Sequence, residues 1–134
     1  MFKKILFATD GSEYANKLIE YIVDLHKKYS SEIVVFHSFQ VPLLYTIEYG
    51  DTLKNSANKT IEDCKKIFEN LNINVKTILL EGNAGDLILE TAESENCDLI
   101  AISSRGKSSL EKFLIGSVSN YVINSSKIPV FIMN

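Results

Sequence analysis

Two short glycine-containing segments carry the residues with the clearest chemistry. The first is Asp10-Gly11-Ser12, which directly follows an apolar run. In the second, Gly106 is followed by nine residues and then by Gly116-Ser117-Val118. Glycine lets a backbone approach phosphate closely, and the free N–H groups at a helix start favour an anion. The pattern is typical of a site for a phosphorylated ligand, with Asp10 facing that ligand or its metal ion.

Both segments also have a purely structural interpretation. Asp10 could cap a helix, because Asp accepts bonds from the first free N–H groups and Glu13 lies three residues later. Gly116-Ser117 could be a glycine turn followed by a serine cap, with Ser117 and Ser119 as further hydrogen-bond donors if a ligand binds. The spacing of the residues alone leaves these alternatives open.

The sequence also leaves two roles possible for the charged residues beside Gly106. Arg105 and Lys107 could reach phosphate oxygens, or they could be solvated loop charges. Gly106-Lys107-Ser108 resembles the end of a P-loop, but that motif needs a glycine five residues before Gly106, where Ala101 stands. We interpret that match as chance.

The elements that position these segments alternate along the chain. Apolar runs predict five strands, and apolar residues at helical spacing predict four helices, at 5–9, 15–26, 33–39, 53–71, 75–80, 84–95, 98–102, 110–122 and 129–133. Such alternation builds a doubly wound, five-stranded parallel sheet with helices on both faces. Ligands then bind at the carboxyl ends of strands where the strand order reverses, here the first and fourth.

One long stretch fits neither pattern. Residues 41–51 are expected to be irregular, yet they hold Leu43, Leu44, Tyr45, Ile47 and Tyr49. An apolar loop of this size covers a site, forms part of an interface, or simply packs on the body.

Composition limits the class of protein. The 134 residues suit one domain, residues 1–134, and the net charge of −3 argues against a nucleic-acid binder. No apolar run reaches the roughly 20 residues that span a membrane. Cys64 and Cys97 form no metal-binding pattern and are expected to be reduced thiols in a cytoplasmic protein. His26 is expected to be a boundary residue of its helix rather than a ligand, and His37 is expected to be a packing residue.

Several motifs together resemble the universal stress protein family. These motifs are residues 8–12, the strand end His37-Ser38, Gly82, residues 106–118 and the closing run 128–132. The likeness extends over residues 3–133. ATP-binding members carry a glycine, two residues, a glycine, nine residues, a glycine and then Ser or Thr. Gly106, Gly116 and Ser117 match three of these positions, and Ser103 replaces the first glycine.

The resemblance implies an adenine nucleotide alpha hydrolase-like, Rossmann-like fold, an ATP, ADP or AMP ligand with magnesium or manganese, and a homodimer formed through the final strand. It places the Ser38 backbone against adenine and the glycine turns against the phosphates. The residues expected to bind the nucleotide are Thr9, Asp10, Ser38, Ser103, Arg105, Gly106, Gly116, Ser117 and Val118.

Ser103 is where the sequence departs from the family pattern. A left-handed backbone at Ser103, or crowding of the nucleotide by its side chain, would weaken the site without removing it.

Three functions follow from this interpretation. The first is an ATP-binding regulatory protein of the stress response. The second is a stress protein that binds no nucleotide and works through protein contacts. The third is an ATPase. Its hydrolysis is expected to be slow, because the loops hold no general base besides Asp10. A phosphoacceptor receiver domain is excluded, since it requires paired acidic residues after the first strand.

Overall fold

A computed structural model describes residues 1–44, 46–106 and 116–133. Strands and helices alternate along this part of the chain, as the sequence predicts. In order they are β1 (Lys4–Ala8), α1 (Glu13–Tyr29), β2 (Glu32–Phe39), α2 (Ile47–Asn70), β3 (Lys76–Glu81), α3 (Ala84–Ser94), β4 (Leu99–Ser103), α4 (Ser117–Ser125) and β5 (Val130–Met133). The part of the last predicted helix that precedes Gly116 lies outside the described residues.

The five strands form one parallel sheet in the order β3-β2-β1-β4-β5. Ile5 of β1 pairs with Ile33 of β2 on one side and with Leu99 of β4 on the other. The chain winds outward in one direction from β1 and in the other from β4. The loops after these two strands therefore meet at the point where strand order reverses, and the predicted doubly wound fold is confirmed.

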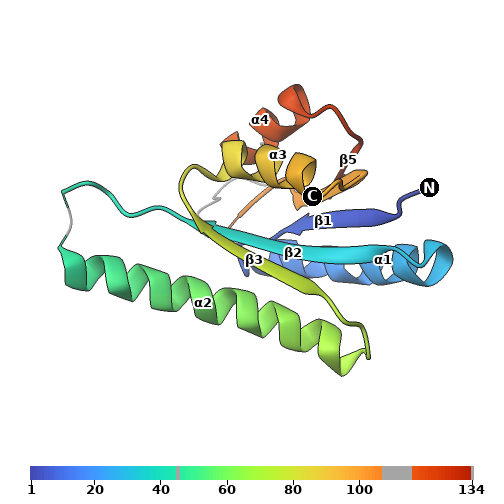
Figure 1. Cartoon of the computed structure of the whole chain (residues 1–134), viewed down its shortest axis with the longest axis horizontal. Helices are drawn as coiled ribbons and strands as arrows, with labels where there is room; N and C mark the ends of the chain where they lie inside the picture. Colours follow the sequence, from blue (N-terminus) through green and yellow to red (C-terminus); the bar gives the residue numbers. More distant parts are fainter. Residues whose placement is uncertain (45, 107–115, 134) are drawn as a thin grey trace.

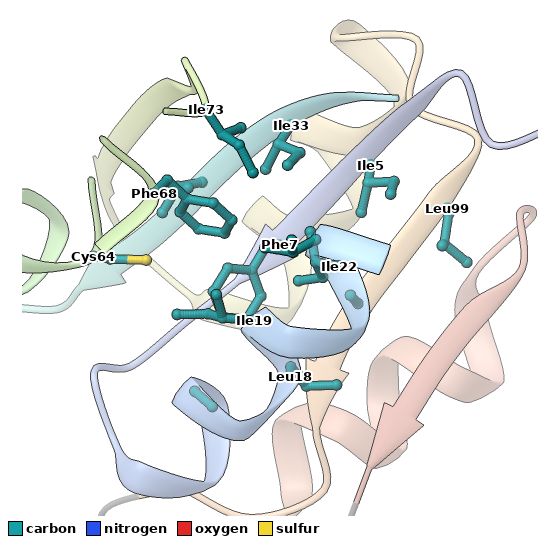
Figure 2. Close-up of a cluster of buried hydrophobic side chains, with 14 of the residues drawn as sticks. Ile5, Phe7, Leu18, Ile19, Ile22, Ile33, Cys64, Phe68, Ile73 and Leu99 are labelled. Atoms are coloured by element: carbon teal, nitrogen blue, oxygen red, sulfur yellow. The ribbon is translucent and has the colours of Figure 1, made fainter. Parts of the chain in front are cut away.

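Helices cover both faces of the sheet, with α1 and α2 on one side and α3 and α4 on the other (Figure 1). Ile5 and Phe7 of β1 belong to the first core, and Leu6 and Ala8 to the second, as the period of two along a strand requires. Figure 2 shows the first core, where Phe7 meets the edge of Phe68 at a ring-centroid distance of 6.3 Å. Burial on both faces explains the continuous apolar runs in the central strands β1 and β4.

Helix α2 begins earlier than the sequence predicts. Residues 47–51 were expected to be irregular, but the helix starts at Ile47 because the Thr46 hydroxyl accepts a hydrogen bond from the Tyr49 amide at 3.2 Å. With 24 residues, α2 is longer than the strands, and its first turns lie beyond the ends of β2 and β3 (Figure 1). Despite this length, neither α2 nor any other helix of the described chain is apolar enough to cross a membrane.

Both cysteines lie in the cores. Cys64 and Cys97 are free thiols, and burial raises the pKa of Cys64 to about 12 and that of Cys97 to about 11. We expect the native chain to incorporate no iodoacetamide at pH 8, because the sulfurs are neither ionised nor accessible. Mass spectrometry after labelling in denaturant should give two adducts per chain. Rapid labelling of the native chain would contradict this burial.

Candidate functional site

The loop after β1 is held by its own short polar residues. The Thr9 amide donates to the carbonyl of Phe36 at 2.9 Å, and the Thr9 hydroxyl accepts from the Gly11 amide at 3.0 Å. Gly11 has a φ of 77°, a left-handed conformation that suits glycine. The turn brings the chain from β1 into α1 within four residues and leaves Asp10 at its corner.

Asp10 does not cap helix α1. The N-cap is Ser12, whose hydroxyl accepts from the Ala15 amide at 3.2 Å. One Asp10 carboxylate oxygen accepts from the Ser12 amide at 2.9 Å, which fixes the carboxylate at the carboxyl end of β1. The helix-cap interpretation of Asp10 is therefore wrong, and Ser12 is the cap that the sequence analysis missed.

The loop after β4 is anchored to its neighbours. Ser104 is fully buried, and its amide donates to the carbonyl of Met133 at 2.9 Å. The Ser103 hydroxyl donates to the carbonyl of Arg105 at 2.6 Å. The buried Ser119 hydroxyl of α4 donates to the carbonyl of Ser103 at 2.7 Å. Ser119 thus holds the loop together, in contrast to its expected role as a donor to a ligand.

Gly106 brings this loop against the first one. A Cβ atom at Gly106 would lie 2.4 Å from the second carboxylate oxygen of Asp10, closer than any side chain permits. A side chain at position 106 would therefore require the Asp10 carboxylate to move, and the Ser12 amide holds that carboxylate in place. The described parts of the two segments singled out from the sequence therefore lie together, at the carboxyl ends of β1 and β4.

Helix α4 begins at the same place. Its N-cap is Gly116, whose amide donates to the carbonyl of Ser104 at 2.6 Å and which offers no side chain to cap the helix. Helices α1, α2 and α3 each have a side-chain cap, from Ser12, Thr46 and Asn83. Ser117 and Val118 in the first turn of α4 are exposed. These N–H groups and the helix dipole can bind an anion.

Arg105 lies beside this site on an aromatic support. Its guanidinium carbon is 4.3 Å from the ring centroid of Tyr14, in the first turn of α1. Within the described chain, the Arg105 Nε atom is buried and lacks a hydrogen-bond partner. A buried N–H without an acceptor is costly, and an incoming anionic oxygen would satisfy it. The sequence analysis missed Tyr14, because nothing in its spacing marks it.

His37 links the end of β2 to the site. Its Nδ1 atom lies 2.7 Å from the carbonyl oxygen of Thr9 and donates to it, since a carbonyl can only accept. The histidine therefore does more than pack, although the sequence predicted packing alone. Ser38 follows it, half-buried and paired with Leu80 of β3. The predicted adenine contact thus lies at the same edge of the sheet as Asp10.

The backbone of Ser103 is not left-handed, so the first of the two expected effects is absent, and crowding of the nucleotide by its side chain stays a prediction. Left-handed backbone angles among the described non-glycine residues occur at Phe2, Ser30, Asn72 and Asn96, so Ser103 has ordinary strand geometry. Its hydroxyl serves the loop through the carbonyl of Arg105. Lys107, the other candidate phosphate contact, lies outside the described residues.

One residue of the candidate site could ligate a divalent ion. Asp10 has a carboxylate that is held by the Ser12 amide and lies beside Gly106, and magnesium bound with a nucleotide usually takes one or two carboxylates plus phosphate oxygens and water. The described residues contain no cluster of three or more His, Cys, Asp or Glu side chains that could hold a metal alone. The site fits a metal that arrives with phosphate.

Comparison with known proteins agrees with this geometry. The model of the universal stress protein family matches residues 1–134. The chain is 29% identical to universal stress protein MJ0531 of Methanocaldococcus jannaschii, over 99% of this chain and 82% of that protein. Its identity to universal stress protein MJ0577 of the same organism is 30%, over 99% and 95% of the two chains.

Solved structures share the fold. That of MJ0577 superposes with a TM-score of 0.87 at 32% identity, covering 99% of this chain and 96% of that one. A universal stress protein from Archaeoglobus fulgidus in complex with dAMP has a TM-score of 0.78 at 19% identity, covering 100% and 98%. One in complex with cAMP has a TM-score of 0.76 at 16% identity, covering 99% and 97%. Family model, relatives and fold together show that this chain belongs to the universal stress protein family.

Proposed function

We propose that the protein binds an adenine nucleotide, ATP with magnesium or manganese, and acts as a regulatory homodimer in the stress response. The observation that carries the proposal is the uncapped start of α4 at Gly116, next to the contact between Gly106 and Asp10. Complexes of two proteins of this fold with dAMP and cAMP support adenine as the base. We further propose that residues 1–134 act as one unit in the cytoplasm.

Each part of the nucleotide has a counterpart in the site. The N–H groups of Ser117 and Val118 suit the phosphates, and Arg105 adds a fixed positive charge. The carboxylate of Asp10 suits a ribose hydroxyl or the metal, and the Ser38 backbone at the end of β2 suits the base. The alternative of a stress protein without nucleotide leaves the buried Arg105 Nε unexplained.

Two measurements test the proposed ligand. The protein is purified without added nucleotide and denatured, and the released small molecules are identified by mass spectrometry. Calorimetry then titrates the ligand-free protein with ATP and magnesium, and with GTP as the control for the base. Binding of ATP with little or no binding of GTP is expected. No binding of ATP at millimolar concentration would overturn the proposal.

The homodimer is proposed through strand β5. This strand lies at the edge of the sheet, paired with β4 on one side only among the described strands. Its four residues are all half-buried rather than buried, and the ring of the exposed Tyr21 of α1 contacts that of Phe131, with centroids 5.7 Å apart and planes at 42°. An apolar edge strand invites pairing with a second copy across a two-fold axis.

Substitution at this edge should weaken the dimer. We expect Val130→Lys and Tyr21→Glu each to raise the dimer dissociation constant at least about tenfold, because each puts a charge into a small apolar interface. Light scattering at micromolar concentrations measures the effect. Tyr49→Glu is the matched control, since Tyr49 is 45% exposed against 44% for Tyr21 but belongs to α2. A one-chain mass for the unmutated protein would refute the dimer.

A further inference from the structure

An apolar projection extends from the carboxyl edge of the sheet. We define this arm as residues 41–44 and 46–53, the connection from β2 and the first turns of α2. Leu43 and Leu44 are 101% and 97% exposed, and Ile47 is 85% exposed. Figure 1 shows the arm reaching away from the body at the end toward which β2 and β3 point. Three large aliphatic side chains so exposed on one short segment mark an interaction surface.

The helical part of the arm has its own stabilising contacts, although Leu43, Leu44 and Ile47 are almost fully exposed. The Thr46 hydroxyl caps α2, and the Gly50 amide donates to the Thr46 carbonyl at 3.0 Å. Val41 packs against Gly50, where a Cβ atom would meet its side chain at 3.5 Å. Leu53 is half-buried along the same stretch of helix. The first turns of α2 are therefore preformed, so a partner that binds them has little of this helix to order.

The charges on the arm narrow the kind of partner. Its only charged residues are Glu48 and Asp51, both exposed, and the next basic residue is Lys54. An anionic lipid surface would repel these carboxylates. The edge proposed for self-association, β5, lies at the far side of the sheet from β2, so the homodimer leaves the arm uncovered. Apolar side chains flanked by carboxylates fit a protein groove with an apolar floor and a basic rim.

We propose that the arm is a docking surface for another protein, which receives Leu43, Leu44 and Ile47 in an apolar groove rimmed by lysine or arginine. This inference goes beyond nucleotide binding, because the arm contains none of the residues of the glycine loops. It gives the regulatory protein a place at which to act on its target.

The experiment uses a photoreactive side chain at the tip. Benzoylphenylalanine replaces Leu44 in the full chain, which is irradiated in cells of the source organism, and the adduct is identified by mass spectrometry. The matched control carries the same replacement at Leu71, which is 50% exposed at the opposite end of α2. An adduct with one other protein from position 44, absent from position 71, is expected.

The captured protein is then purified and its affinity measured by calorimetry. Leu43→Ser with Leu44→Ser should weaken binding at least about tenfold, because buried apolar anchors dominate such interfaces. Leu71→Ser should leave binding unchanged, and Glu48→Gln with Asp51→Asn should weaken it and reduce its salt dependence. Equal melting temperatures show that the variants fold.

Four outcomes would overturn the proposal. They are no adduct from position 44, an adduct only with a second copy of this chain, an adduct only with lipid, and a captured protein that binds the serine variant as tightly as the unmutated chain. None of them depends on nucleotide, so a failure to bind ATP would leave this test intact.

Discussion

Gly116→Val is expected to reduce the affinity for ATP by at least about 100-fold, equivalent to about 2.8 kcal/mol. A single Cβ atom at Gly116 would already lie 3.1 Å from the carbonyl oxygen of Ser104, and valine adds two methyl groups to it. The loop must then move away from Ser104, and the first N–H groups of α4 lose their position for phosphate. Calorimetry with ATP and magnesium measures the loss.

A second glycine substitution separates this local effect from general damage. Gly50→Val is the control, since a Cβ atom at Gly50 meets Val41 at an ordinary 3.5 Å and lies outside the candidate site. It should bind ATP like the unmutated chain. If Gly116→Val keeps full affinity while its melting temperature is unchanged, the start of α4 does not bind phosphate and the proposed site is wrong.

Gly106→Ala is expected to lower the free energy of unfolding by about 1–3 kcal/mol. The new methyl group would lie 2.4 Å from a carboxylate oxygen of Asp10, and the Ser12 amide holds that carboxylate in place. Asp10 must leave its hydrogen bond to make room. Because the carboxylate is displaced, the affinity for ATP should fall as well.

A double-mutant cycle identifies the cause. In Asp10→Ala with Gly106→Ala the carboxylate is gone, so the alanine at position 106 should cost less than it does alone. We expect a coupling of at least about 1 kcal/mol between the two positions, measured by urea unfolding of all four proteins. ATP affinity should stay low in the double variant, because Asp10 is absent. Strictly additive changes in the free energy of unfolding would show that a side chain at position 106 does not collide with Asp10.

The fold was predictable because apolar runs and helical spacing alternate without interruption. The run 5–9 corresponds to β1, and the spacing from Ala15 onward corresponds to the buried face of α1. The start of α2 was not predictable, because Gly50 and Asp51 are poor helix formers and the first turns bury almost nothing. Periodicity indicates a helix only where one face is buried.

The site was predictable in its parts but not in how they meet. Glycines and an aspartate after strands indicate a ligand site, and parallel topology places both loops at one edge. Nothing in the spacing shows that a side chain at position 106 would collide with Asp10, since the two residues are distant in the sequence. The support of Arg105 by Tyr14 is equally non-local. Sequence patterns report local geometry, and these contacts exist only in the folded chain.

The position of β1 between β2 and β4 has a consequence for how the molecule forms. Ile5 pairs with Leu99, and the Asp98 carboxylate accepts from the amides of Lys3 and Lys4, so β1 is synthesised long before the strand with which it pairs. Closing so long a loop is slow, and pairs distant in sequence form late in folding. Any ligand held between β1 and β4 therefore binds only chains that have completed this step, and it shifts the folding equilibrium toward them.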